Sequence, residues 1–141
     1  DPAEILAREF TEGYDEMVAV HGVEFWSLCE HHLLPFHGTA TIAYLPEGRV
    51  VGLSKLARLV QAFARRLQVQ ERLTDQIADA IDRHLETRGV AVHVEAEHLC
   101  MAMRGVRLPA TTVTRAFRGA FREGEPRREF IELVQRGGHK P

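Results

Sequence analysis

The chain has 141 residues, of which 45% are hydrophobic, and its formal net charge at pH 7 is −2. This length predicts a single domain, residues 1–141, with a moderate core. The nearly balanced charge argues against non-specific nucleic-acid binding. No apolar run approaches the roughly 20 residues of a membrane span, and the charged start has no signal-peptide pattern, so no membrane partner is expected. With two cysteines only, a cytoplasmic location is the expectation.

The first half of the chain predicts a short helix followed by two strands. Asp1 and Pro2 suit the N-cap and first position of a brief helix, and residues 1–16 are expected to form this helix and a connector before the core, 17–141. Hydrophobic residues alternate from Met17 to Cys29, which predicts a strand with Gly22 as a bulge. After Leu33-Leu34-Pro35, the β-rich run from Phe36 to Tyr44 predicts the second strand.

The second half predicts two amphipathic helices and two further strands. Ser54 is a good N-cap for the first helix, and the second is expected to run to Arg88-Gly89, with the glycine as C-cap. Alternation from Val90 to Cys100 predicts the third strand, and the β-branched run 111–114 the fourth. A last short helix should follow Glu125-Pro126. Four sequentially paired strands with helices on one face form an α+β fold.

Chemically active side chains gather in Cys29-Glu30-His31-His32. The second cysteine, Cys100, follows His98 by two positions, so on a strand both face the same side, about 7 Å apart. Thiolate and imidazole groups bind zinc, and three protein ligands leave a fourth position for water. Cys29, one or both histidines of the motif and Cys100 make such a set. A disulfide between the two cysteines, or two inert buried thiols, are the alternatives.

Four motifs, in order, make the chain resemble the GTP cyclohydrolase I family over nearly its whole length. They are Ser27-Leu28-Cys29-Glu30-His31-His32, Gly52-Leu53-Ser54-Lys55-Leu56-Ala57-Arg58, Gln68-Val69-Gln70-Glu71-Arg72-Leu73-Thr74 and Glu97-His98-Leu99-Cys100-Met101-Ala102-Met103-Arg104-Gly105. The resemblance implies the tunnelling fold, in which a β-β-α-α-β-β unit assembles through edge strands into pentameric barrels that stack into a homodecamer. It also implies active sites at subunit interfaces.

The implied reaction is hydrolysis of the GTP imidazole ring, with release of C8 as formate and formation of 7,8-dihydroneopterin triphosphate, the first step of folate or biopterin synthesis. The resemblance also assigns residues to roles. Cys29, His32 and Cys100 resemble the ligands of one zinc ion per chain, and His31 and His98 resemble proton-transfer histidines. Gln70 and Glu71 resemble the guanine anchor, Lys55, Arg58 and Arg104 resemble the triphosphate clamp, and Ser54 lies where the family has a serine near the ribose.

Simpler interpretations stand beside these assignments. Without the resemblance, Ser54 is a helix cap, and Lys55 and Arg58 form a solvated helix face. Glu30 is expected either to be structural or to orient a ligand histidine. Trp26 and Phe36 are expected to lie in the core.

Two other functions fit the chain. One is another pterin- or purine-processing enzyme of the same fold, and the other is a nucleotide- or metal-binding module with a structural zinc. The family normally carries a longer N-terminal helical region with a Thr-Pro-x-Arg helix whose basic residues help to bind phosphate. Because this chain begins at Asp1, part of the phosphate site is expected to be missing.

Overall fold

A computed structural model describes residues 1–6, 9–10, 16–98 and 110–137 of the chain. Its centre is a five-stranded sheet in the order β5-β2-β3-β6-β7. These strands are β5 (Leu67–Gln68), β2 (Val18–Cys29), β3 (Pro35–Pro46), β6 (Thr87–His98) and β7 (Thr112–Gly119). The four long strands pair antiparallel in chain order, and only the short β5 runs parallel to its neighbour β2. The predicted pairing of four sequential strands is confirmed.

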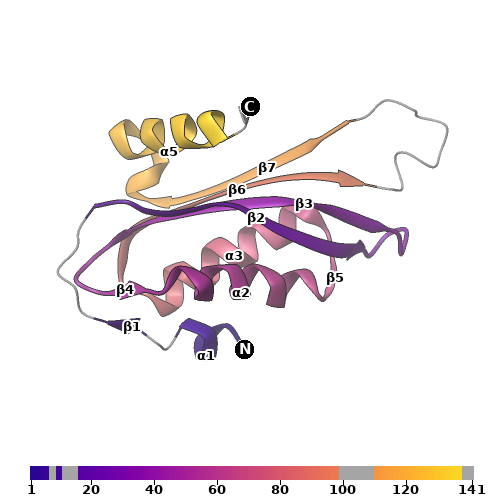
Figure 1. Ribbon diagram of the computed structural model, residues 1–141, viewed down its shortest axis with the longest axis horizontal. Helices are drawn as coiled ribbons and strands as arrows, with labels where there is room; N and C mark the ends of the chain where they lie inside the picture. Colours follow the sequence, from indigo (N-terminus) through magenta and orange to yellow (C-terminus); the bar gives the residue numbers. More distant parts are fainter. Residues whose placement is uncertain (7–8, 11–15, 99–109, 138–141) are drawn as a thin grey trace.

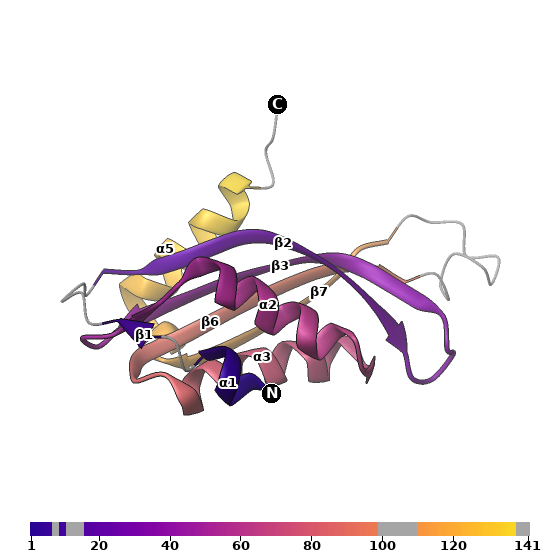
Figure 2. The same cartoon turned by 60° about the horizontal axis from the view of Figure 1, so that its bottom comes forward.

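The remaining elements lie around this sheet. A small separate pair is formed by β1 (Glu9–Phe10) and β4 (Val50–Val51). The helices are α1 (Pro2–Leu6), α2 (Leu53–Ala64), α3 (Gln70–His84), the 3-10 turn η1 (Ala120–Arg122) and α5 (Gly124–Gly137). Figure 1 shows α2 and α3 on one face of the sheet and α5 on the other, and Figure 2 shows α1 beside α2. Within the described part of the chain, no helix is long and apolar enough to cross a bilayer.

The alternation of each strand sorts its side chains between two hydrophobic cores. Phe25, Phe36 and Ile42 belong to the larger core, which α2 and α3 cover. Ala43 and Ala91, which point to the opposite face, belong to a smaller core with α5 and η1. The prediction of two helices on one face is confirmed, whereas the C-terminal helix lies on the other face. It packs there because Phe130 and Val134 of α5 are buried at helical spacing.

A bulge in β2 bends the sheet near its first residues. The register with β3 shifts between the pairs Val20↔Ile42 and Val23↔Ala40. Gly22 has a φ of 71°, a conformation that glycine adopts at little cost, and its amide donates to the hydroxyl of Thr41 at 3.2 Å. The predicted bulge is therefore confirmed.

Three local predictions were wrong. Helix α2 begins at Leu53 with Gly52 as N-cap, so Ser54 lies inside its first turn and caps nothing. Helix α3 ends at His84, and Gly89 lies in β6, where an added Cβ would stand 2.8 Å from the carbonyl oxygen of Arg118. Glycine is needed there for close strand contact, not for a helix end. Phe36 is fully buried as predicted, but Trp26 is 64% exposed and stacks on the ring of His37.

Candidate functional site

The thiol of Cys29 and the imidazole of His32 face each other across a tight turn at the end of β2. The amide of Leu33 donates to the carbonyl oxygen of Cys29 at 2.8 Å, and the amide of Cys29 donates to that of Leu34 at 2.9 Å. Leu33 takes a φ of 54°, a left-handed conformation that costs a residue with a side chain about 1 kcal/mol. The turn leaves Cys29 buried and brings its Sγ to 3.7 Å from His32 Nδ1.

This separation suits a shared metal ion. Zinc held tetrahedrally by a thiolate at ~2.3 Å and an imidazole nitrogen at ~2.0 Å places its two donors about 3.5 Å apart, close to the 3.7 Å between Sγ and Nδ1. Within residues 1–6, 9–10, 16–98 and 110–137, no third histidine, cysteine or carboxylate completes a cluster around the pair. Cys100, the expected third ligand, lies outside the described residues, and so does Arg104.

Glu30 anchors this turn to the start of α3. Both of its carboxylate oxygens accept hydrogen bonds from the guanidinium of Arg72, at 2.6 and 2.8 Å. These bonds hold the pKa of the Glu30 carboxyl below its usual value. The Glu30 amide also donates to the carbonyl oxygen of Gln68 in β5 at 2.9 Å. Of the two expected roles of Glu30, these contacts support the structural one, because its side-chain partner is an arginine.

His98, at the end of β6, lies on the same face of the sheet as Cys29. Its backbone partner is Phe36 on the intervening strand β3, which places the two strands that carry His98 and Cys29 about 10 Å apart. The imidazole stacks on the Phe36 ring, with centroids 4.6 Å apart and planes 1° from parallel. Burial lowers the pKa of His98, and the negative charge of Glu71 opposes this shift. His31, by contrast, is exposed, and its ring is nearly perpendicular to that of His32.

Gln70 and Glu71 form the first turn of α3 and differ in exposure. Glu71 is exposed, so its carboxylate is open to a ligand. Gln70 is 1% exposed, and its amide has protein partners at both ends, including His98 Nε2 at 2.7 Å from Oε1. No sequence pattern indicates this Gln70–His98 contact, because the two residues come from different elements.

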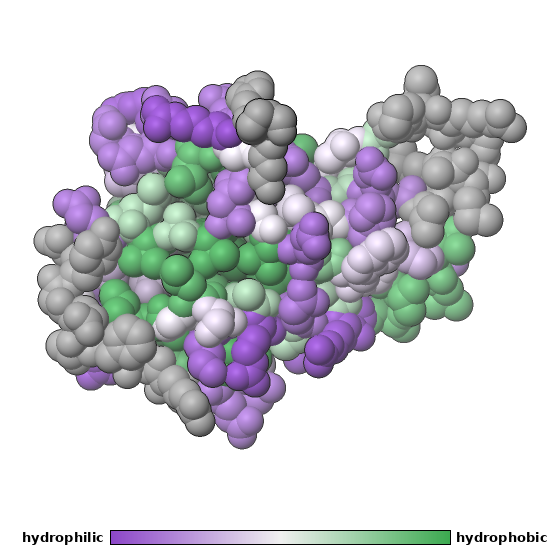
Figure 3. All heavy atoms as spheres, viewed as in Figure 1, coloured by the Kyte–Doolittle hydropathy of each residue, from purple (hydrophilic) through white to green (hydrophobic). Residues whose placement is uncertain are grey.

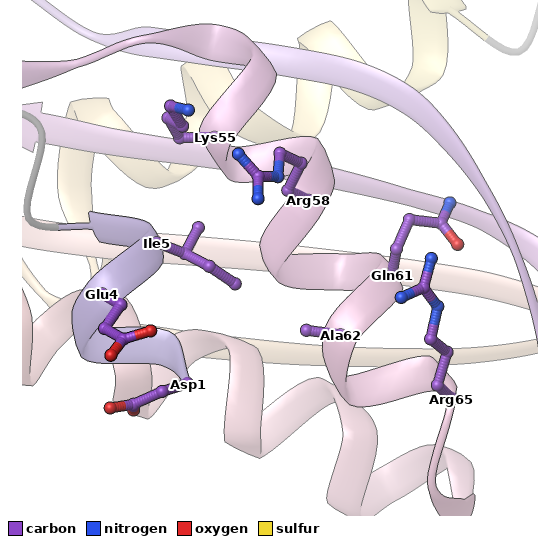
Figure 4. A pocket seen from close by; sticks show the side chains of 8 residues that line it. All are labelled: Asp1, Glu4, Ile5, Lys55, Arg58, Gln61, Ala62 and Arg65. Carbon is purple, nitrogen blue, oxygen red and sulfur yellow. The ribbon is translucent and has the colours of Figure 1, made fainter.

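A row of cations lines a cavity of about 500 Å³ between α1 and α2 (Figure 4). Lys55 and Arg58 come from α2 and Arg65 directly follows it, whereas Glu4 comes from α1 and Asp1 directly precedes it. None of the three cations forms an ion pair with a residue in the described part of the chain. The spacings of three, seven and ten residues among these three cations could have indicated a shared face from the sequence.

One chain does not bring all the predicted site residues together. Ser54 and Lys55 lie in the first turn of α2, whereas β5 and the Cys29 turn follow its last turn (Figure 2). A helix of 12 residues is about 18 Å long. The chain thus presents two half-sites, a thiol–imidazole half at the β2 end and a cationic half near α1.

Comparisons with known proteins found a matching family and similar curated sequences. The family model described as GTP cyclohydrolase I matches residues 1–135. Among curated relatives, GTP cyclohydrolase 1 of Thermobifida fusca is 58% identical over 137 residues, covering 94% of this chain and 66% of the relative. That of Chlorobium chlorochromatii is 55% identical over 139 residues, covering 96% and 62%. The chain thus spans a little under two thirds of the length of these relatives.

Solved structures support the fold alone. An archaeosine synthase QueF-Like in the apo form aligns with a TM-score of 0.61 at 16% identity, covering 76% of this chain and 97% of the other. E. coli dihydroneopterin aldolase in complex with neopterin aligns with a TM-score of 0.52 at 8% identity, covering 72% and 98%. Both are tunnelling-fold proteins, so the predicted α+β tunnelling fold is confirmed.

Proposed function

Because the chain belongs to the GTP cyclohydrolase I family, we propose that it forms the catalytic part of an enzyme that hydrolyses the imidazole ring of GTP. Water adds to the ring, C8 leaves as formate, and the opened nucleotide recloses to 7,8-dihydroneopterin triphosphate, the first step of pteridine synthesis. The observation that best supports this proposal is the Cys29–His32 pair, whose 3.7 Å separation suits zinc. The pair lies on the face of the sheet that also carries His98.

Cys29 and His32, together with Cys100, are the proposed ligands of one zinc ion per chain. Thiolate and imidazole donors are those that zinc prefers, and a three-ligand site leaves one position open. When bound, zinc would supply a water ligand that ionises near neutral pH. The ion pair between Glu30 and Arg72 supports this role indirectly, because it holds the turn that carries both donors against α3.

Side chains around this turn are proposed to handle the protons and the base. His31 and His98 carry protons, a task suited to imidazole. The exposed carboxylate of Glu71 accepts hydrogen bonds from N1–H and the 2-amino group of guanine. Adenine lacks this pair of adjacent donors, which gives the site its base specificity. Gln70 belongs to this subsite through its backbone, since its side chain is buried.

The triphosphate is proposed to bind the cationic half-site. Lys55 and Arg58 line the cavity beside α1 and have no ion-pair partner among the residues that the structure describes. They are therefore free to form charge-assisted hydrogen bonds with phosphate oxygens, which are stronger than neutral ones. Arg104 joins them in this proposal. Ser54, which lies in the same turn as Lys55, is proposed to lie near the ribose.

The Cys29 turn lies beyond the last turn of α2, whereas Ser54 and Lys55 lie in its first turn, and this separation favours an active site shared between chains. The sheet has open edges for such assembly, since β7 is terminal and only two residues of β2 pair with β5. Unpaired edges invite pairing with another chain. Apolar side chains that are exposed in the single chain lie on both edges, including Leu28 and Leu67 on one and Val113 on the other. Figure 3 shows apolar surface at the end of the β2–β3 hairpin. We propose edge-to-edge pentamers and a homodecamer with interfacial active sites.

The test is release of formate and fluorescent pterin from GTP, with zinc quantified in the same sample. Because the relatives are longer, the full-length protein and residues 1–141 are assayed in parallel. We expect product and about one zinc per chain in the full-length protein. Product from a verified metal-free sample would refute the mechanism, and zinc without product in the full-length protein would favour the binding-module alternative.

A further inference from the structure

The buried amide of Gln70 has an orientation that its partners determine. Its nitrogen, Nε2, lies 3.0 Å from the carbonyl oxygen of Thr112 and 3.3 Å from that of Val94. Backbone carbonyl oxygens can only accept hydrogen bonds, so the NH2 end of the amide must face them. The oxygen end, Oε1, therefore faces the remaining partner, His98 Nε2, at 2.7 Å.

The hydrogen bonds of two threonine hydroxyls independently require the same orientation of the Gln70 amide. Thr74 donates its single proton to the carbonyl oxygen of Gln70 at 2.9 Å. Its oxygen, 2.7 Å from that of Thr114, must then accept the Thr114 proton. Thr114 Oγ1 is left to accept from Gln70 Nε2 at 3.1 Å, so the two amide protons are shared among three acceptors, of which the Val94 oxygen is the most distant. The result is a closed ring of directed hydrogen bonds that begins and ends on Gln70, and the members of such a ring strengthen one another.

The ring determines which nitrogen of His98 carries the proton. An amide oxygen cannot donate, so His98 Nε2 must donate to it, and in the neutral imidazole the lone pair then lies on Nδ1. The stacked Phe36 ring holds the plane of the imidazole. We propose that Gln70 is a positioning residue that holds His98 as the Nε2–H tautomer, so that His98 accepts and returns its proton through Nδ1 alone.

The tautomer follows from the hydrogen bonds alone, whereas proton transfer by His98 rests on the proposed function. The proposal also gives the Gln70 side chain a role other than contact with guanine. A glutamine that held the base through its side chain would need a free amide end, and both ends are occupied by the protein.

The direct test is the 15N spectrum of His98 in full-length, zinc-loaded protein labelled at histidine, recorded by magic-angle spinning so that assembly size is no obstacle. His98→Gln assigns the signal. We expect a protonated Nε2 and an unprotonated Nδ1 in the wild type, and a mixture of tautomers in Gln70→Met. The matched control is Gln68→Met, which removes a glutamine that is equally buried but bonds to Phe63 and Gln76. A wild-type spectrum with the proton on Nδ1 would overturn the proposal. This measurement does not depend on the folding of any variant.

The kinetic constants kcat and KM distinguish a positioning role of Gln70 from a substrate-binding role. Loss of a partner that orients a functional histidine costs about 10- to 100-fold in activity, so Gln70→Met should lower kcat by that factor and leave KM for GTP within about twofold. An unchanged kcat with a raised KM would make Gln70 a substrate-binding residue and overturn the proposal. If the wild type released no formate, the proposed function would fail, while the wild-type spectrum would still decide the tautomer.

Discussion

Replacing Glu71 with alanine should weaken recognition of guanine and leave zinc binding intact. The carboxylate lies exposed in the first turn of α3 and is proposed to accept two hydrogen bonds from the base. A hydrogen bond to a charged group contributes about 1.5–3 kcal/mol, and the exposure of Glu71 favours the lower figure. Two bonds then amount to about 3 kcal/mol, or roughly a 150-fold loss in kcat/KM for GTP.

Inosine triphosphate supplies an internal measure of the same contact. It lacks the 2-amino group and so loses one of the two bonds, which predicts a kcat/KM about 10-fold lower than for GTP in the wild type. In Glu71→Ala the two nucleotides should become nearly equal, because the discriminating acceptor is gone. The assay is formate release with each nucleotide.

Two controls keep this prediction specific. Glu86→Ala removes another exposed carboxylate, in the link between α3 and β6, and should change neither selectivity nor rate. Zinc content of Glu71→Ala should stay near one per chain. Equal kcat/KM values for GTP and inosine triphosphate in the wild type would refute the two-bond contact.

The other predictions concern the metal, the phosphates and the core. Cys29→Ser should lower zinc, measured by elemental analysis, well below one per chain with an unchanged circular dichroism spectrum; full zinc occupancy would contradict the ligand assignment. Arg58→Ala should raise KM for GTP about 10-fold, whereas Arg122→Ala, which removes an exposed cation of η1, should not; equal effects would refute the subsite. Phe130→Ala should destabilise the fold by about 3–5 kcal/mol in urea denaturation, because its ring is fully buried between α5 and the sheet; a loss below ~1 kcal/mol would show that this core contributes little.

Several elements could be predicted from local patterns because their physical causes are local. The alternation in β2 and β6 and the helical spacing in α2 and α3 reflect which residues must face a core. The bulge at Gly22 was also predictable, since glycine in a strand marks a site where the backbone departs from regular pairing.

Helix ends were harder to predict from the sequence, because a residue type that suits a helix cap can instead be required by a contact between strands. Gly89 had the right chemistry for a helix C-cap, yet the tight approach of β6 to β7 requires a residue without a side chain there. Trp26 likewise is a residue type common in cores, but it follows Phe25 on the strand and so points away from the core that α2 and α3 cover, where it stays exposed and stacks on His37.

The sequence by itself determined the order of elements, the resemblance to a family and the residue types available for chemistry. A thiol and imidazoles within four positions already indicate a metal site, since donor chemistry is a property of the residues. Only the tertiary structure decided how these groups are held. The Glu30–Arg72 ion pair and the Gln70–His98 hydrogen bond each join residues from separate elements. A proton's location on His98 depends on such partners, because a hydrogen bond is set by distance and direction in space.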